Sequence, residues 1–278
     1  MTSEGVDARS CTFAEYNSLF DEHGGTDSDY LKKHFLRFQN TFKRVSSSWS
    51  DGESQVIVDV GAHWLHQSLL YALAGGKIEA FNAPTTFKKE RVRRLADAYG
   101  INLTTVDELE TGECFYGLAE SSVDIVLFTE ILEHITFNPV RFWRIVYRIM
   151  KPGARIIITT PNYYSINGRG YEFRRLLSGG GEGLTVEGIL RTHTFGHHWK
   201  EYSMREVSRY FTLLSPDFKC IRCEYTDDRK PEEKNEGVVR YLEKWFPFLR
   251  PGLHIEVELA EKKQGIEIKP GWYPSIWS

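Results

Sequence analysis

The chain has 278 residues, of which 26% are charged and 41% hydrophobic, and its formal net charge is −3. This composition is typical of a globular protein with one large α/β domain, and the acidic balance of charge counts against a nucleic-acid partner. Because the chain shows no long apolar run and no basic start before an apolar stretch, we expect no membrane span, no signal peptide and a cytoplasmic location.

The first predicted element is an amphipathic helix over residues 29–45, after a polar start that we expect to be loose. Asp29 is placed to act as its N-cap, and basic residues occupy its other faces. We interpret it as packed on the main domain with a solvated basic side, or alternatively as closing over a ligand. Its apolar positions, spaced by three or four residues, are Leu31, Phe35, Phe38, Phe42 and Val45.

Short β-branched runs then alternate with helical patterns. We predict strands at residues 55–60, 77–81, 102–106, 124–128 and 154–159, with helices that end at Gly75 and that span 86–99 and 139–150. This rhythm specifies a parallel, doubly wound, Rossmann-like sheet. Strands at 218–225 and 253–260 close the sheet, and helices at 203–213 and 238–249 precede them.

The last of these strands alternates between polar and apolar residues, which is typical of a strand with one exposed face. We therefore expect His254, Glu256 and Glu258 to face solvent. The aromatic residues of the 238–249 helix are interpreted as core residues or as a homodimer contact.

The chain has four cysteines, which are too few and too scattered for a disulfide framework. Cys220 and Cys223 form a CxxC pair inside a predicted strand, where residues three apart should point to opposite faces. We interpret both as ordinary strand residues.

We divide the chain into an N-terminal helical segment, residues 1–50, a core formed by residues 51–161 and 203–278, and an insertion, residues 162–202. The insertion is rich in Tyr, Gly and His and is too long for a simple connection. We expect a lid on the substrate side, and the alternative is a surface loop.

Residues 122–138 contain a buried strand that runs directly into acid/base and metal-competent side chains. In open α/β sheets, ligands bind beyond the carboxyl ends of the strands, which is where Glu130, Glu133 and His134 stand. If the chain turns helical at Glu130, this spacing places all three on one face. The sequence therefore predicts the functional site here.

A series of motifs resembles the class I S-adenosylmethionine-dependent methyltransferases. DVGAHWL stands at the position of the cofactor loop, DIVLFTEILEHI resembles the fourth-strand motif, RIMKPGARIIITTPN resembles the motif of the fifth strand, and HHWKEYSMREV resembles the stretch after the substrate insertion. The resemblance covers about residues 30–262. It implies a seven-stranded sheet with an antiparallel last strand, and S-adenosylmethionine as the cofactor.

The resemblance also implies a cofactor crevice at the ends of consecutive strands. Asp59 and Gly61 would meet the methionine end of the cofactor. His63 and Leu65 replace the later glycines of the motif, so we expect the loop to run wider or to hold the cofactor in a different pose. The implied cofactor-binding residues are Asp59, Gly61, His63, Asn82, Asp107 and Thr129.

Two of these residues depart from the family pattern or have another interpretation. Asn82 stands where the family has a ribose-binding acid, and an uncharged amide should bind the ribose more weakly. Asp107 stands where an acidic side chain meets the adenine, and the alternative is that it caps a turn.

The ExxEH sequence at residues 130–134 resembles the metal site of small-RNA 3′-terminal 2′-O-methyltransferases and of ubiquinone-pathway O-methyltransferases. The resemblance implies a Mg²⁺, Mn²⁺ or Zn²⁺ ion held by Glu130, Glu133, His134 and a later histidine, His198. Such an ion would lower the pKa of a substrate hydroxyl. The alternative is a site without metal, in which the glutamate caps a helix and the histidine packs nearby.

The resemblance thus implies an S-adenosylmethionine-dependent O-methyltransferase that acts on a hydroxyl of a sugar, a glycan or another small molecule. A neutral imidazole can accept the hydroxyl proton near pH 7, so the candidate bases are His134, His193, His197 and His198. One alternative is a catalytically eroded methyltransferase-like partner subunit, which the altered glycine loop favours. Another is an RNA 2′-O-methyltransferase, which the acidic net charge disfavours.

Overall fold

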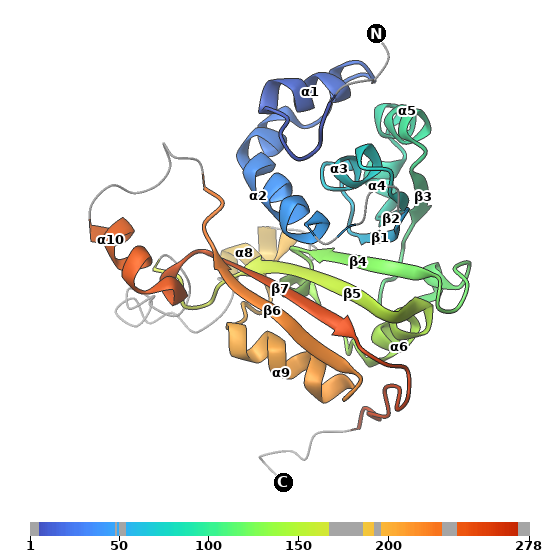
Figure 1. Cartoon of the computed structure of the whole chain (residues 1–278), viewed down its shortest axis with the longest axis vertical. Coiled ribbons are helices and arrows are strands. Elements are labelled where there is room, and N and C mark those ends of the chain that lie inside the picture. The colour runs from blue at the N-terminus through green and yellow to red at the C-terminus, as the bar shows by residue number, and fades with distance from the viewer. Residues whose placement is uncertain are drawn as a thin grey trace.

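The computed structural model describes residues 6–47, 49, 54–166, 186–191, 196–229 and 238–271. Within these residues, seven strands form one sheet in the order β3-β2-β1-β4-β5-β7-β6, with helices on both faces (Figure 1). The first five strands pair in parallel, and β7 runs antiparallel to both of its neighbours. The prediction of a Rossmann-like, seven-stranded sheet is therefore confirmed.

The strands lie close to their predicted positions, because each central run is apolar on both faces. The largest difference is β5, which begins earlier than predicted. The strands are β1 (Val56–Val60), β2 (Lys77–Asn82), β3 (Asn102–Thr105), β4 (Val123–Thr129), β5 (Met150–Pro161), β6 (Phe218–Thr226) and β7 (Gly252–Leu259).

Most helices also follow the prediction. The helix predicted over 86–99 is broken into α4 and α5, and two helices, α1 and α8, were not predicted. The described helices are α1 (Phe13–Asp21), α2 (Ser28–Ser46), α3 (Ser68–Leu73), α4 (Pro84–Phe87), α5 (Glu90–Tyr99), α6 (Val140–Ile149), α8 (Val186–Arg191), α9 (Met204–Leu214) and α10 (Val238–Trp245). Short 3-10 turns are η1 (Glu113–Phe115), η2 (Leu132–His134) and η6 (Pro247–Leu249).

Helix α1 lies within the polar start of the chain, whereas the extreme N-terminus, residues 1–5, lies outside the described residues. Thr12 and Glu15 form a capping box at its N-terminus. Tyr16 and Phe20 are buried, and the Tyr16 hydroxyl donates a hydrogen bond of 2.8 Å to the carbonyl of His66. The next helix is α2, and its N-cap is Asp27 rather than the predicted Asp29.

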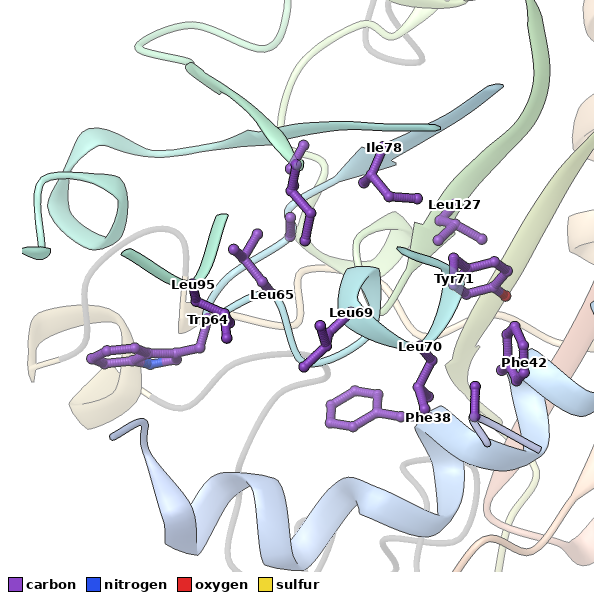
Figure 2. Packing of buried hydrophobic residues seen from close by; sticks show 14 of the residues in the cluster. Phe38, Phe42, Trp64, Leu65, Leu69, Leu70, Tyr71, Ile78, Leu95 and Leu127 are labelled. Atoms are coloured by element: carbon purple, nitrogen blue, oxygen red, sulfur yellow. The ribbon is translucent and has the colours of Figure 1, made fainter. Parts of the chain in front are cut away.

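The N-terminal helices form part of the core on one face of the sheet. In Figure 2, Phe38 and Phe42 of α2 lie beside Leu70 and Tyr71 of α3, and sheet residues lie behind them. The same cluster includes Leu127 of β4 and other sheet residues. The helix at 29–45 is therefore packed on the main domain, as the apolar periodicity predicted.

The opposite face of the sheet is covered by α6 and α9. Trp143 of α6 packs against Phe211 of α9, with ring centroids 5.0 Å apart. The alternate residues of β1, such as Val58 and Val60, face this second cluster. The two faces of the sheet are thus buried under different sets of helices (Figure 1).

The prediction that β7 has an exposed face is wrong. His254 and Glu256 are buried, because β7 lies between β5 and β6 and α2 covers this face. The Glu256 carboxylate accepts hydrogen bonds from Arg155, at 3.1 Å, and from Arg222, at 2.8 Å. Both guanidinium groups also donate to backbone carbonyls at the end of α2. Polar residues in this strand therefore mark a buried ionic layer.

The structure also corrects the expected side-chain directions of the CxxC pair. The pairing of β6 with β7 shifts between Cys220 and Arg222, so Ile221 is an extra residue in a β-bulge. Cys220 pairs with Val257 and Cys223 with Ile255, two positions apart on β7. The two thiols therefore share one face of the sheet.

The aromatic residues of the predicted 238–249 helix are exposed, so their interpretation as core is wrong. Tyr241 and Trp245 are each 62% exposed, and Phe246 and Phe248 lie beside them with similar exposure. Their use as a homodimer contact stays a prediction.

None of the helices in the described ranges has the length and apolar character needed to cross a membrane.

Most of the insertion predicted to be a lid lies outside the described residues, and so does His193. Its described end, residues 196–202, returns to the main domain. The Trp199 amide donates to the carbonyl of Glu133 at 2.8 Å, and Tyr202 forms a bridge with Asn162. This return places His197 and His198 beside the end of β4.

Candidate active site at the carboxyl ends of the strands

The loop after β1 keeps a glycine-like backbone without the later glycines of the motif. Gly61, His63 and Leu65 have φ values of 75°, 48° and 67°, all in the left-handed region that favours glycine. Leu65 is held there by a fully buried side chain and by a 2.8 Å hydrogen bond from its amide to Ala62. The three glycine positions of the motif thus share a left-handed backbone, and a wider loop or a different cofactor pose stays a prediction.

Gly61 fixes how closely the loop approaches the end of β4. A Cβ atom at Gly61 would lie 2.2 Å from the Cδ1 atom of Ile131, so any side chain there would force Ile131 to move. The Gly61 and Ala62 amides donate to the carbonyl of Phe81 at the end of β2, at 2.8 and 3.1 Å. The loop after β1 and the segment after β4 therefore touch at one point.

Asp59 is buried under this loop on the face covered by α2 and α3. Its carboxylate accepts a 2.6 Å hydrogen bond from the Ser68 hydroxyl in the first turn of α3. Burial raises the pKa of Asp59 to about 6, and the bond from Ser68 opposes this shift. Asp59 thus holds the start of α3 against the loop after β1.

The other predicted cofactor residues stand at neighbouring strand ends. Asn82 ends β2, is partly exposed, and accepts a hydrogen bond at its backbone carbonyl from the Val106 amide. Asp107 follows β3 and is exposed. Thr129 ends β4 and pairs with Thr159 of β5. The register of the parallel strands brings these ends to one edge of the sheet.

Glu130 does not begin a helix, which corrects the geometry predicted for the ExxEH sequence. Its φ of 55° turns the chain sharply after β4, and η2 begins only at Leu132. The Glu130 carboxylate forms an ion pair of 3.0 Å with Arg37 of α2. Glu130 is therefore directed to α2 and stands outside the cluster of side chains described next.

Glu133, His134 and His198 come together. One ligand atom from each lies within 4.8 Å of the others, and the rings of His134 and His198 are 4.9 Å apart. The Nδ1 atom of His134 lies 2.9 Å from the carbonyl of His197, which can only accept. Nδ1 therefore carries the proton, and Nε2 of the neutral ring is free to accept a proton or bind a metal.

Glu133 is fully buried in this cluster. Its Oε2 atom accepts a 2.9 Å hydrogen bond from Thr160 of β5, whereas its Oε1 atom is buried without a hydrogen-bond partner. Burial raises the pKa of Glu133 to about 8, with a further contribution from the negative charge of Glu130. Burial also lowers the pKa of His134. An orphaned carboxylate oxygen 4.0 Å from His134 Nε2 is suited to a ligand between them.

Sequence reasoning missed the contribution of α2. Its polar stripe lies one position away from its apolar stripe, at Tyr30, His34, Arg37, Thr41 and Arg44. The Tyr30 ring lies 4.9 Å from that of His63, Arg37 pairs with Glu130, and Arg44 pairs with Glu224 near the end of β6. The side predicted to be solvated therefore contacts the ends of several strands. The regular spacing of these polar residues is the feature of the sequence that could have indicated the contact.

A polar cavity of about 440 Å³ opens at the far end of the same edge, between α2, β6 and α10. None of the predicted site residues lines it. Its lining contains the ion pair Arg44–Glu224, and the lining residue Glu243 pairs with Arg229. We assign no chemistry to it.

The comparisons with known proteins agree with this architecture. Residues 86–158 match the family model described as "Methyltransferase domain". No curated protein matches the chain in sequence.

Solved structures of similar fold span nearly the whole chain. A chain of the Haloferax volcanii complex that contains the Trm112 methyltransferase activator has a TM-score of 0.55 and 15% identity, covering 89% of this chain and 98% of its own. A SAM-dependent methyltransferase from Archaeoglobus fulgidus has a TM-score of 0.52 and 15% identity, covering 84% and 100%. One from Mesorhizobium loti has a TM-score of 0.51 and 15% identity, covering 79% and 96%.

At this level of identity the structural matches establish the fold, and the family match covers the segment from α4 through most of β5. The chain therefore has the Rossmann-like fold of the class I S-adenosylmethionine-dependent methyltransferases and carries a methyltransferase-domain segment at residues 86–158.

Proposed function

We propose that this protein transfers a methyl group from S-adenosylmethionine to a hydroxyl oxygen of a sugar, a glycan or another small molecule. The observation that carries the proposal is the cluster of Glu133, His134 and His198. It follows directly after Ile131, the residue that touches Gly61 of the cofactor loop. A proton acceptor thus lies next to the loop at which the methyl donor is expected.

The residues of the loop fit the cofactor. The left-handed positions turn the loop tightly beside the strand ends, where a polar ligand can approach. Asn82 stands at the end of β2 to bond a ribose hydroxyl as donor or acceptor. This preserved backbone favours an enzyme over an eroded binding subunit.

In the proposed reaction, bound S-adenosylmethionine would supply an electrophilic methyl group: the acceptor oxygen would form a bond to the methyl carbon, and S-adenosylhomocysteine would leave as the thioether. His134 Nε2 takes the proton of the acceptor hydroxyl, while the carbonyl of His197 fixes the ring through Nδ1. Buried Glu133 stands beside His134, and in its ionised form its carboxylate stabilises the imidazolium that forms. The ring of His198 closes the other side of this site.

The same residues could instead hold a divalent ion, for which Glu133 Oε1, His134 and His198 supply one oxygen and two nitrogen ligands. Glu130 is not placed to join them, because it pairs with Arg37. The ion would bind the acceptor oxygen and lower the pKa of its hydroxyl. The base and the ion are two versions of the same O-methyl transfer.

The variants His134→Asn and Glu133→Gln test the proposal. An asparagine keeps a donor for the carbonyl of His197 but removes Nε2, so turnover of a panel of sugar and phenolic acceptors should fall by about 10²-fold or more. Calorimetry should show unchanged binding of S-adenosylhomocysteine. His23→Asn, a histidine beside Tyr99 of α5, is the matched control and should keep full activity.

Two further measurements separate the alternatives. Titration of the protein with Zn²⁺ or Mn²⁺ alone should show binding that Glu133→Gln abolishes if the ion version holds, and activity should survive a chelator if the base version holds. If neither S-adenosylmethionine nor S-adenosylhomocysteine binds up to millimolar concentration, the enzyme proposal fails and the binding-subunit alternative replaces it.

A further inference from the structure

The β-bulge in β6 brings two thiols together on the exposed side of the sheet edge. Ile221 is the extra residue, so Cys220 and Cys223 point to the same face, toward α9. Their Sγ atoms lie 2.7 Å apart, and both residues are exposed. Because β6 is the outermost strand next to β7, no further strand of the described sheet covers this pair.

The surroundings of the pair keep the two sulfur atoms in contact. The Ser208 hydroxyl of α9 lies 3.6 Å from Cys220 Sγ and 3.5 Å from Cys223 Sγ. Only a small movement separates this arrangement from the bond length of a disulfide, about 2.05 Å. The other two cysteines differ: Cys11 is buried and Cys114 is partly buried.

The two thiols also differ in acidity. The hydrogen bond from the Cys220 thiol lowers the pKa of Cys223 to about 6 and raises the pKa of Cys220. At neutral pH the pair therefore holds one proton on Cys220 and a nucleophilic thiolate on Cys223. This division of roles, one attacking thiolate and one neighbouring thiol, is the one that disulfide exchange requires.

We propose that Cys220 and Cys223 form a thiol–disulfide exchange site, which reacts with low-molecular-weight disulfides and closes to an intrachain disulfide across the β-bulge. The Cys223 thiolate attacks one sulfur of the small disulfide, and the second sulfur leaves as a thiolate that takes up a proton. The Cys220 thiol then loses its proton and attacks Cys223 Sγ, which releases the second small thiol. Relative to the dithiol, the chain loses two protons and two electrons, and one small disulfide takes them up to become two thiols.

A metal site is the competing use of two adjacent thiols. Among the described residues, these two thiols are the ligands that the structure offers here, whereas zinc in structural sites takes four. Within the described ranges, the group of three potential ligands around one point is Glu133, His134 and His198, which does not include these cysteines. The geometry thus favours exchange between the two sulfurs.

The test uses the full-length protein, which is first reduced and then separated from the reductant. It is incubated with oxidised glutathione at pH 7, the reaction is quenched with N-ethylmaleimide, and the mass of the product is measured by mass spectrometry. The expected product has lost about 2 Da, carries no glutathione, and has two alkylation sites fewer after denaturation. Peptide mapping should show a disulfide between Cys220 and Cys223. The rate of alkylation at Cys223 should be half-maximal near pH 6.

Single variants assign the two roles. Cys220→Ser should stop at a stable glutathione adduct on Cys223, and Cys223→Ser should react at least about tenfold more slowly, because the remaining thiol is protonated. Cys114→Ser is the matched control and should form the disulfide at the wild-type rate.

Two results would overturn the proposal. One is a wild-type protein that keeps both thiols, or only a glutathione adduct, at equilibrium with oxidised glutathione. The other is tight binding of Zn²⁺ alone to the reduced pair together with failure to form the disulfide, which would make the pair a metal site. Both readouts are independent of methyl transfer, so they stand apart from the proposed function.

Discussion

In the loop after β1, His63 and Leu65 adopt the same left-handed backbone conformation as Gly61, although this conformation normally requires glycine. A non-glycine residue in the left-handed region costs about 1–2 kcal/mol, so the fold must compensate twice in one loop. The buried side chain of Leu65 and the ring contacts of His63 with Tyr30 and Trp64 supply this compensation. A sequence pattern that counts glycines misses such a loop.

Gly61→Ala should be far more harmful than the same change at another left-handed glycine. The new methyl group would collide with Ile131, so we expect a loss of about 2 kcal/mol or more in unfolding free energy, and weaker cofactor binding. Gly75→Ala, with φ of 85° and open space around it, is the control and should cost about 1 kcal/mol. Urea unfolding measures the loss of stability in both variants. When Ile131→Ala is added to Gly61→Ala, it should remove the part of the loss that comes from the collision and leave the part that comes from the left-handed backbone. Equal losses at both glycines would contradict the contact.

Asp59 should make stability fall as the pH rises from about 4 to 6. Its pKa is about 6 in the folded chain and about 3.9 in the unfolded chain, so the folded state holds the proton more tightly. This contribution, about 3 kcal/mol, is fully present below pH 4 and is lost as the pH rises through 6. In Asp59→Asn the loss should be absent.

The measurement is urea unfolding of both proteins between about pH 4 and pH 7, and the quantity of interest is their difference at each pH. The difference removes the contributions of His34, His66 and Glu133, whose pKa values also shift. A difference that does not change with pH would show that Asp59 is not responsible.

At the scale of elements, the sequence predicted what apolar spacing controls and missed what depends on neighbouring strands. The strands and the apolar face of α2 followed from periodicity, because each must bury one face whatever surrounds it. The burial of Glu256 and the pairing of Cys220 with Cys223 did not follow. The first depends on a helix from the other end of the chain, and the second depends on a bulge set by the partner strand.

The candidate site divides in the same way. The ExxEH sequence located the cluster, and the return of His198 to it followed from chain direction. The sequence could not predict that the Glu130 side chain points away from the cluster. This direction depends on the left-handed backbone of Glu130 itself and on its ion pair with Arg37 of α2.

Arg37→Ala should loosen α2 from the end of β4. The Arg37–Glu130 pair is partly buried, with side chains 18% and 24% exposed, so its loss should cost about 1–3 kcal/mol. Lys33→Ala, an exposed residue on the same helix, should cost almost nothing. A double-mutant cycle with Glu130→Ala isolates the pair, and a coupling near zero would mean that the two residues merely stand near each other.

At the scale of the whole molecule, the N-terminal helices are part of the same core as the sheet. The first cluster joins Phe38 and Phe42 of α2 to Ile57 of β1 and to Ile157 of β5. The ionic layer around Glu256 adds polar contacts between the end of α2, β5, β6 and β7. Without α2, one face of the sheet would expose both apolar and charged groups that now have partners.

We therefore predict that α2 and β1 unfold together. In native-state hydrogen exchange at increasing urea, the amides of Phe42 and Val58 should converge on one free energy of opening, because both lie in the central core. The amides of α10, whose Tyr241 and Trp245 are exposed, should instead exchange through a local opening of low free energy. If the amides of α2 exchanged as easily as those of α10, the helix would be an appended segment, and its contacts with Glu130 and the cofactor loop could not hold the candidate site in place.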